Sequence, residues 1–221
     1  MLDIDHGTYP FVTSSNTIAG AAAVGTGLGP RDLHRVLGIV KAYTTRVGSG
    51  PFPTELAMDE PGSVGHHLST VGQERGTVTG RPRRCGWLDA VLLRESVTVN
   101  GLTDFAINKL DILSGMPELK ICTAYDIDGK ITEDFPMTLA ETERAKPVYE
   151  TLPGWQEDLR GMTTVEELGP HAVTFHLRDS VVYEHPEGVA VQWVPLGEGT
   201  VDFKAIVARA ADLMPPGVRV Y

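Results

Sequence analysis

The sequence contains few cysteines and no long apolar run. Of its 221 residues only Cys85 and Cys122 are cysteines, and their separation matches neither a disulfide framework nor a zinc-binding spacing. No stretch approaches the roughly 18 consecutive apolar residues that a membrane-spanning helix needs, and the first residues form no basic and apolar leader. We therefore expect a protein of the reducing cytoplasm, without export or membrane anchoring.

Positive charge is also scarce. Lys and Arg number 19 against 29 Asp and Glu, which gives a formal net charge of -10 and a pI of about 5.1. Long-range repulsion from polyanions argues against a protein that binds nucleic acids or anionic membranes. A hydrophobic content of 42% and a charged content of 22% are ordinary for folded globular chains. Any anion-binding site must therefore be local.

One short segment concentrates the positive charge. From Gly76 to Gly86 the chain reads Gly-Thr-Val-Thr-Gly-Arg-Pro-Arg-Arg-Cys-Gly. Arginine offers paired donors that match carboxylate and phosphate oxygens, and glycine lets backbone N–H groups approach the same anion. The segment predicts an anion-binding site, and the alternative is a solvated turn whose arginines pair with acidic residues. The arginines would lower the pKa of Cys85, but without a nearby base or second thiol we assign it no chemistry.

The first half of the chain predicts helices separated by glycine and proline loops. Hydroxyl-rich residues 13–17 precede an Ala-rich helix that stops at residues 25–30; the hydroxyls either cap this helix or contact a phosphate at its N-terminus. Residues 32–45 have apolar side chains at helical spacing, which favours a helix or a helix passing into a strand. Residues 59–76 are predicted to form an exposed loop with a short helix, and residues 87–99 an amphipathic helix.

Strand patterns follow. Residues 104–113 alternate and run into a turn, and residues 119–125 predict a strand before a hairpin turn at Asp128-Gly129. The tetrad Asn108-Lys109-Leu110-Asp111 ends the first strand, and open α/β sheets hold ligands beyond the carboxyl ends of strands. An aspartate there can accept hydrogen bonds from N1 and the exocyclic amine of guanine, while lysine methylenes cover the base. The alternative is a simple salt bridge.

Taken in order, these pieces resemble the adenylosuccinate synthetase family over residues 2 to about 160. The matching phrases are Leu2-Asp3-Ile4-Asp5-His6-Gly7-Thr8-Tyr9-Pro10, Val12-Thr13-Ser14-Ser15-Asn16-Thr17, Gly50-Pro51-Phe52-Pro53-Thr54-Glu55-Leu56, Thr77-Val78-Thr79-Gly80-Arg81-Pro82-Arg83-Arg84, Asn108-Lys109-Leu110-Asp111 and Tyr149-Glu150-Thr151-Leu152-Pro153-Gly154-Trp155. Six separate matches in the right order are far more specific than any one. The fold implied is α/β, part of the P-loop-type synthetase fold with a mixed central sheet, followed by a short α/β tail.

The resemblance implies a ligase of AMP biosynthesis. GTP would phosphorylate the 6-oxygen of IMP and L-aspartate would displace the phosphate, with magnesium, giving adenylosuccinate, GDP and phosphate. The implied contacts are Thr13 to IMP; Thr77, Val78, Thr79, Gly80, Arg81, Pro82 and Arg83 to aspartate, with Arg81 also reaching IMP and Arg83 also reaching GTP; and Lys109, Leu110 and Asp111 to guanine. The resemblance also implies a homodimer that acts in the cytoplasm.

Two departures from the family pattern shape the expectations. Family members begin with a glycine-rich phosphate loop that carries a catalytic aspartate, followed by a catalytic histidine, and this chain starts after both. The resemblance therefore assigns no catalytic residue and no magnesium ligand here, and implies weak or no turnover by this piece alone. A non-catalytic module that binds a guanine nucleotide or a dicarboxylate is the alternative.

The other departure is a second unit expected over residues 161–221. Segments 169–179 and 194–203 resemble late βα units of xylose-isomerase-like sugar isomerases and epimerases, which are TIM barrels. That resemblance would make His176 a divalent-metal ligand. Two units cannot close a barrel and one histidine cannot form a metal site, so we assign no metal ligand. A metal-dependent sugar isomerase is the third functional alternative.

Overall fold

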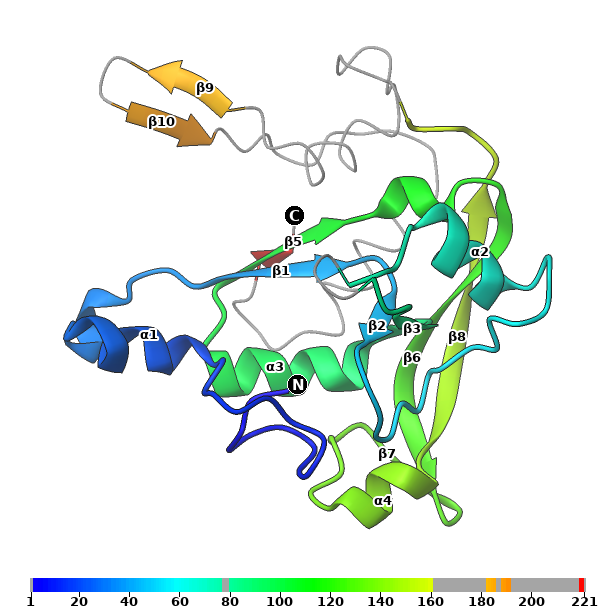
Figure 1. Ribbon diagram of the computed structural model, residues 1–221, viewed down its shortest axis with the longest axis horizontal. Coiled ribbons are helices and arrows are strands. Elements are labelled where there is room, and N and C mark those ends of the chain that lie inside the picture. The colour runs from blue at the N-terminus through cyan, green and yellow to red at the C-terminus, as the bar shows by residue number, and fades with distance from the viewer. Residues whose placement is uncertain (1, 77–79, 161–181, 186–187, 192–218, 221) are drawn as a thin grey trace.

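The computed structural model describes residues 2–76, 80–160, 182–185, 188–191 and 219–220 (Figure 1). Its helices are α1 (Ala19–Thr26), α2 (Val64–Val71), α3 (Ala90–Asn100) and α4 (Leu139–Arg144), with the 3-10 helices η1 (Pro30–Asp32) and η2 (Leu110–Leu113). Its strands are β1 (Leu37–Lys41), β2 (Thr44–Arg46), β3 (Arg84–Gly86), β4 (Leu88–Asp89), β5 (Asp104–Asn108), β6 (Met116–Ile127), β7 (Lys130–Thr132), β8 (Lys146–Trp155), β9 (Val182–His185), β10 (Gly188–Val191) and β11 (Arg219–Val220). The predicted α/β class with mixed sheets is confirmed.

A parallel sheet carries the candidate binding residues. Its strand order is β1-β5-β11, and β1 pairs with β5 in a register that aligns Leu37 with Asp104 and Lys41 with Asn108. Because both strands run in the same direction, the residues that follow Lys41 and Asn108 leave the sheet at one edge. This is the edge at which open α/β sheets hold their ligands.

A long antiparallel ribbon forms the second main sheet. Strands β6 and β8 pair from Met116 opposite Trp155 to Asp126 opposite Lys146, with β4 parallel to β6 and β7 returning from it as a hairpin. The predicted hairpin turn is confirmed: Asp128 and Gly129 both have positive φ, 55° and 86°, as a two-residue hairpin turn requires. Figure 1 shows α3 beside the β1–β5 pair and the β6–β8 ribbon beyond one end of that pair.

The main hydrophobic core joins the two sheets. Its buried members include Leu68 of α2, Ile107 of β5, Leu119 and Ile121 of β6, and Trp155 of β8. Side chains from sequence positions this far apart bury one another only in the assembled fold, so the ribbon and the parallel sheet stabilise each other.

Helix α3 has caps at both ends. The Asp89 carboxylate accepts a hydrogen bond from Leu92 N at 3.0 Å, and Gly101 ends the helix with a φ of 60°, a conformation in which glycine carries no steric penalty. The predicted helix over residues 87–99 is confirmed in type, although Trp87 lies between β3 and β4 and the next two residues form β4. None of the helices in the described ranges is long and apolar enough to cross a lipid bilayer.

Helix α1 lies where the Ala-rich pattern predicts it and ends at Gly27, which has a φ of 75°. Its N-cap residue is Ile18, whose side chain makes no capping hydrogen bond, so the predicted capping by hydroxyls of residues 13–17 is wrong. The amide oxygen of Asn100 instead accepts from Ala19 N at 2.8 Å. This contact ties the start of α1 to the end of α3.

For residues 32–45 a helix throughout is wrong, and of the alternative, a helix passing into a strand, only the strand is found. After η1 the chain extends into β1 and then β2. The apolar spacing of Leu33, Val36, Leu37 and Val40 is helical, yet the backbone of β1 forms its hydrogen bonds with β5. Pairing with a distant strand outweighs a local pattern over so short a segment.

Candidate anion-binding site

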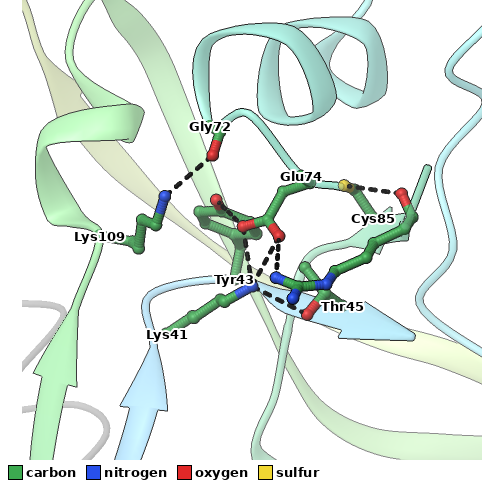
Figure 2. Close-up of polar contacts among 8 residues, drawn as sticks. Lys41, Tyr43, Thr45, Gly72, Glu74, Cys85 and Lys109 are labelled. Atoms are coloured by element: carbon green, nitrogen blue, oxygen red, sulfur yellow. Dashed lines mark hydrogen bonds and ion pairs between the residues drawn. The ribbon is translucent and has the colours of Figure 1, made fainter. Parts of the chain in front are cut away.

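The candidate site is centred on one buried carboxylate, Glu74, in the bend after α2 (Figure 2). Its side chain is only 1% exposed. Lys41 Nζ donates to both carboxylate oxygens at 2.8 and 2.7 Å, the Tyr43 hydroxyl donates at 2.6 Å and Arg83 Nη1 at 3.0 Å. Lys41 Nζ also donates to Thr45 Oγ1 at 3.1 Å. One carboxylate thus gathers two cations and a hydroxyl, and we call Lys41, Tyr43, Glu74 and Arg83 the Glu74 cluster.

Burial and pairing fix the charges of this cluster. Burial alone would raise the pKa of Glu74, but the hydrogen bonds from Lys41, Tyr43 and Arg83 outweigh it and lower the pKa below its ordinary value. Burial lowers the pKa of Lys41, and nearby Arg83 and Lys109 act in the same direction against the pull of Glu74. Burial and Glu74 raise the pKa of Tyr43 well above its usual range. At neutral pH the cluster therefore holds a carboxylate and a protonated phenol.

Backbone hydrogen bonds join the two ends of the predicted aspartate-binding loop. Arg83 N donates to Glu74 O at 2.8 Å, and Gly76 N donates to Arg81 O at 2.8 Å. Gly80 has a φ of 65° and donates from its N to Gly76 O at 2.8 Å. Gly80, Arg81 and Pro82 are exposed; Thr77, Val78 and Thr79 lie outside the described residues. The described ends of the loop are thus held by backbone hydrogen bonds beside the Glu74 cluster.

The guanine-binding prediction falls at the same edge of the sheet. Lys109 follows β5 directly, and its Nζ donates to Gly72 O at 2.8 Å, two residues before Glu74. Figure 2 shows the Lys109 and Lys41 side chains approaching this bend from neighbouring strand ends. Asp111 is 4% exposed and close enough to raise the pKa of Tyr43. The structure therefore brings Arg83 and Lys109 to one bend and places Asp111 near Tyr43 of the same cluster.

Leu110 differs from its neighbours in the tetrad. Its side chain is 2% exposed and belongs to the main hydrophobic core. A ligand at this edge could contact only the backbone of Leu110. The side chain of neighbouring Lys109 instead extends to the bend after α2.

Thr13 lies in a separate loop. Thr13 N donates to Leu2 O at 2.7 Å, and the contacts of the described residues join it to Leu2 rather than to the Glu74 cluster. Asp3 closes this loop, because its buried carboxylate accepts from the backbone N–H groups of Asp5, His6, Thr17 and Ile18. The loop is thus organised around one carboxylate, as the Glu74 cluster is.

A hollow of about 550 Å³ lies between the end of the Thr13 segment and two residues of the Glu74 cluster, Lys41 and Tyr43. Its lining includes Thr17, which ends the Thr13 segment, and Lys41, Tyr43 and Thr45 from the Glu74 side. Pockets for small ligands commonly occupy roughly 300–1,000 Å³. The hollow therefore brings the end of the Thr13 segment and part of the Glu74 cluster to one space of ligand size.

The alternative of a turn with paired arginines holds for part of the arginine segment. Arg84 Nε donates to Glu55 Oε1 at 2.6 Å and Nη2 contacts the other oxygen, so Arg84 is engaged away from the cluster. The expected low pKa of Cys85 is wrong: burial, with Glu74 nearby, raises it to about 11. A neutral buried thiol adds no nucleophile to the site.

The described residues were also searched for groups of side chains that could bind a metal ion. Within the part of the chain that the structure describes, no three His, Cys, Asp or Glu side chains gather closely enough to hold a metal ion. His176 lies outside the described residues.

The family follows from the comparisons. A family model described as adenylosuccinate synthetase matches residues 1–202. The chain belongs to the adenylosuccinate synthetase family. The synthetase of Methylibium petroleiphilum is 62% identical over 168 residues, which are 76% of this chain and 38% of the relative. That of Albidiferax ferrireducens is 53% identical over 197 residues, 89% of this chain and 42% of the relative.

A solved structure of the adenylosuccinate synthetase family agrees with the fold. The fully ligated adenylosuccinate synthetase from Plasmodium falciparum is 41% identical, has a TM-score of 0.70, and is matched over 80% of this chain and 42% of its own length. This chain spans about two fifths of the length of the relatives named here.

The comparisons do not support the sugar isomerase resemblance. The match to the adenylosuccinate synthetase model continues to residue 202, well past the change of pattern inferred at about residue 160. Two short segments that read as strand and loop occur in many folds, which is why that likeness was unspecific. Of the tail, the structure describes the β9–β10 pair and β11, which extends the β1–β5 sheet. The division into units 1–160 and 161–221 stays a prediction.

Four residues of the site were missed from the sequence. Lys41 and Tyr43 fell in the predicted helix, Glu74 in a predicted exposed loop, and Asp3 only in a matched phrase. For Glu74 a usable signal was present: an acidic residue just before an arginine-rich segment in an acidic chain. The burial of Glu74, which lets it accept hydrogen bonds from several side chains, arises only when β1, α2 and β3 pack together.

Proposed function

We propose that this chain contributes the guanine-nucleotide and L-aspartate binding half of an adenylosuccinate synthetase. In the reaction GTP phosphorylates the 6-oxygen of IMP, and the amine of L-aspartate then displaces the phosphate, giving adenylosuccinate, GDP and phosphate. Family membership supports the reaction. The observation that carries the residue assignment is the approach of Lys109 and Arg83 to the same Gly72–Glu74 bend.

The chemistry of each residue fits its role. L-aspartate is a dicarboxylate, and the paired donors of Arg81 and Arg83 match carboxylate oxygens. Exposed Gly80 lets backbone N–H groups approach the ligand closely. Arg83 stands between this loop and Lys109 and can serve both ligands. Positive charge there stabilises the negative charge that develops on the transferred phosphoryl group.

The Asp111 carboxylate is the proposed reader of the base. It accepts hydrogen bonds from N1 and the exocyclic amine of guanine, while the methylenes of Lys109 lie against the ring. Thr13 is proposed to contact IMP at the hollow that its segment borders through Thr17. We further propose that the protein acts in the cytoplasm and as a homodimer.

Calorimetry with GDP, IDP and L-aspartate tests this function. Inosine lacks the exocyclic amine, so we expect IDP to bind the purified chain roughly tenfold more weakly than GDP. Asp111→Asn should reduce GDP affinity by roughly 10- to 100-fold and leave L-aspartate affinity unchanged. A wild-type chain that melts cooperatively but gives no heat with any of the three ligands would overturn the proposal, and equal affinity for GDP and IDP would overturn the role of Asp111.

A further inference from the structure

The Glu74 cluster has a feature that anion binding by itself does not require. An anion site gains affinity from positive charge, yet the best buried group here is a carboxylate that is 1% exposed. It accepts from Lys41, Tyr43 and Arg83, whereas Arg83 and Lys41 retain 30% and 24% side-chain exposure. The cations therefore reach solvent and the carboxylate does not.

The contacts also show what Glu74 constrains. Arg83 uses one nitrogen of its guanidinium to contact Glu74, which leaves donors on the other nitrogens for a ligand. The same residue's backbone donates to Glu74 O at 2.8 Å. Arg83 is thus fixed at both its backbone and its tip by one residue. Lys41, at the end of β1, is held by both oxygens of the same carboxylate.

We propose that Glu74 is a positioning residue: it holds the Arg83 guanidinium in the orientation that meets the anionic groups of the ligands, and it keeps the charge of the Lys41 ammonium beside them. The proposal rests on the proposed function for the identity of the ligands. It adds that a negative charge at this position increases anion affinity, because ordering two long side chains in advance removes an entropic cost of binding.

The sign of one substitution separates positioning from simple electrostatics. Glu74→Gln keeps the shape but removes a negative charge beside the anion site. If Glu74 acted only as a charge, this variant would bind GDP and L-aspartate more tightly. Positioning predicts the opposite: affinity for L-aspartate and for GDP should fall by roughly 10- to 100-fold, because the charge-assisted bonds that order Arg83 and Lys41 are weakened.

Two further variants make the test independent of folding defects. Tyr43→Phe leaves every charge in place and removes only the hydroxyl that steadies Glu74, so we expect an affinity loss of about fivefold. Glu55→Gln is the matched control, because Glu55 pairs with Arg84 outside the cluster; it should leave both affinities within about twofold of wild type. Cooperative thermal melting establishes that each variant is folded.

A ligand-free measurement keeps this proposal distinct from the proposed function. In the NMR spectrum of the chain, the Arg83 guanidinium should show hindered rotation that is lost in Glu74→Gln and kept in Glu55→Gln. Wild type that binds neither ligand overturns the proposed function, and the Arg83 signal then decides whether Glu74 orders the side chain. Unchanged Arg83 rotation in folded Glu74→Gln, or equal or tighter anion binding by that variant, would overturn the proposal. If Glu74→Gln does not fold, unchanged affinity in Tyr43→Phe would do so.

Discussion

Two regions of the molecule are held together in different ways. The proposed binding side is organised around buried carboxylates: Glu74 accepts from Lys41, Tyr43 and Arg83, and Asp3 accepts from the backbone of its own loop. The β6–β8 ribbon instead rests on continuous strand pairing and on buried apolar side chains such as Leu119. Polar groups order the proposed binding side, and apolar burial stabilises the ribbon.

This difference has a physical cause. Apolar burial is non-directional and depends little on pH, so it can stabilise the ribbon but cannot orient a charged side chain. A buried carboxylate with several donors is costly to break and fixes the directions of the groups bonded to it. Substitutions in the ribbon should therefore change stability without changing ligand preference, whereas substitutions around the carboxylates should change pH dependence and binding.

The largest effect on stability is expected in the ribbon. Leu119 of β6 is 2% exposed and belongs to the main core, so Leu119→Ala should lower the free energy of unfolding by about 2–5 kcal/mol through lost burial and a cavity. Urea denaturation measures the change, and the ratio of GDP to IDP affinity of the folded variant should match wild type. A loss below about 1 kcal/mol would mean that apolar burial does not stabilise the ribbon.

A pH effect is expected on the proposed binding side. Burial would raise the pKa of Asp3, but the N–H groups of Thr17 and Asp5 outweigh it and lower the pKa to about 2 from an ordinary 3.8. Because the folded-state pKa is the lower one, the carboxylate stabilises the fold above about pH 4, and this contribution disappears as the pH falls from about 4 to about 2.

Asp3→Asn isolates this contribution. The difference in urea midpoint between wild type and variant should be constant above pH 5 and shrink between pH 4 and 2. Asp158, whose pKa Arg160 also lowers to about 2, is common to both proteins and cancels. A difference that does not vary with pH would show that the Asp3 charge does not hold the loop.

The smallest effect concerns the two cysteines, one in each region. Burial raises the pKa of Cys85, beside the Glu74 cluster, to about 11, and raises that of Cys122 in β6 further still. Alkylation by iodoacetamide at pH 8 should be slow at both, since the thiolate fraction of Cys85 is only about one in a thousand, and slower at Cys122. Both should react alike in urea. Rapid labelling of Cys122 in the folded chain would contradict the expectation that the thiol in the ribbon is less reactive than the thiol beside the Glu74 cluster.

The sequence predicts the strands and turns better than the proposed binding side. The hairpin turn at Asp128-Gly129 and the strand that begins at Asp104 follow from local chemistry that the fold leaves unchanged. The strand predicted over residues 104–113 is too long, because β5 ends at Asn108 and η2 follows it. The burial of Glu74 could not be predicted, because it depends on Lys41 arriving from a strand whose pattern reads as a helix. The role of Asp3 could not be predicted for a similar reason, because its hydrogen-bond partners include Thr17 and Ile18, which lie 14 and 15 positions further along the chain.

The proximity of the predicted site residues could be predicted only from several motifs taken together. Arg83 and Lys109 lie 26 positions apart, and no local pattern requires both to contact the same bend. The matched phrases indicated a shared ligand. The structure adds the physical link, a buried carboxylate and a backbone carbonyl in one bend.

The most direct measurement is an NMR titration of the chain with GDP and then with L-aspartate, following backbone amide shifts. We expect GDP to shift the signals of Gly72, Glu74, Lys109 and Asp111 together at one common affinity. L-aspartate should then shift Arg83 and the loop before it. GDP shifts confined to one side of the Glu74 cluster, or shifts for the two ligands on separate surfaces, would contradict a single site built by these residues.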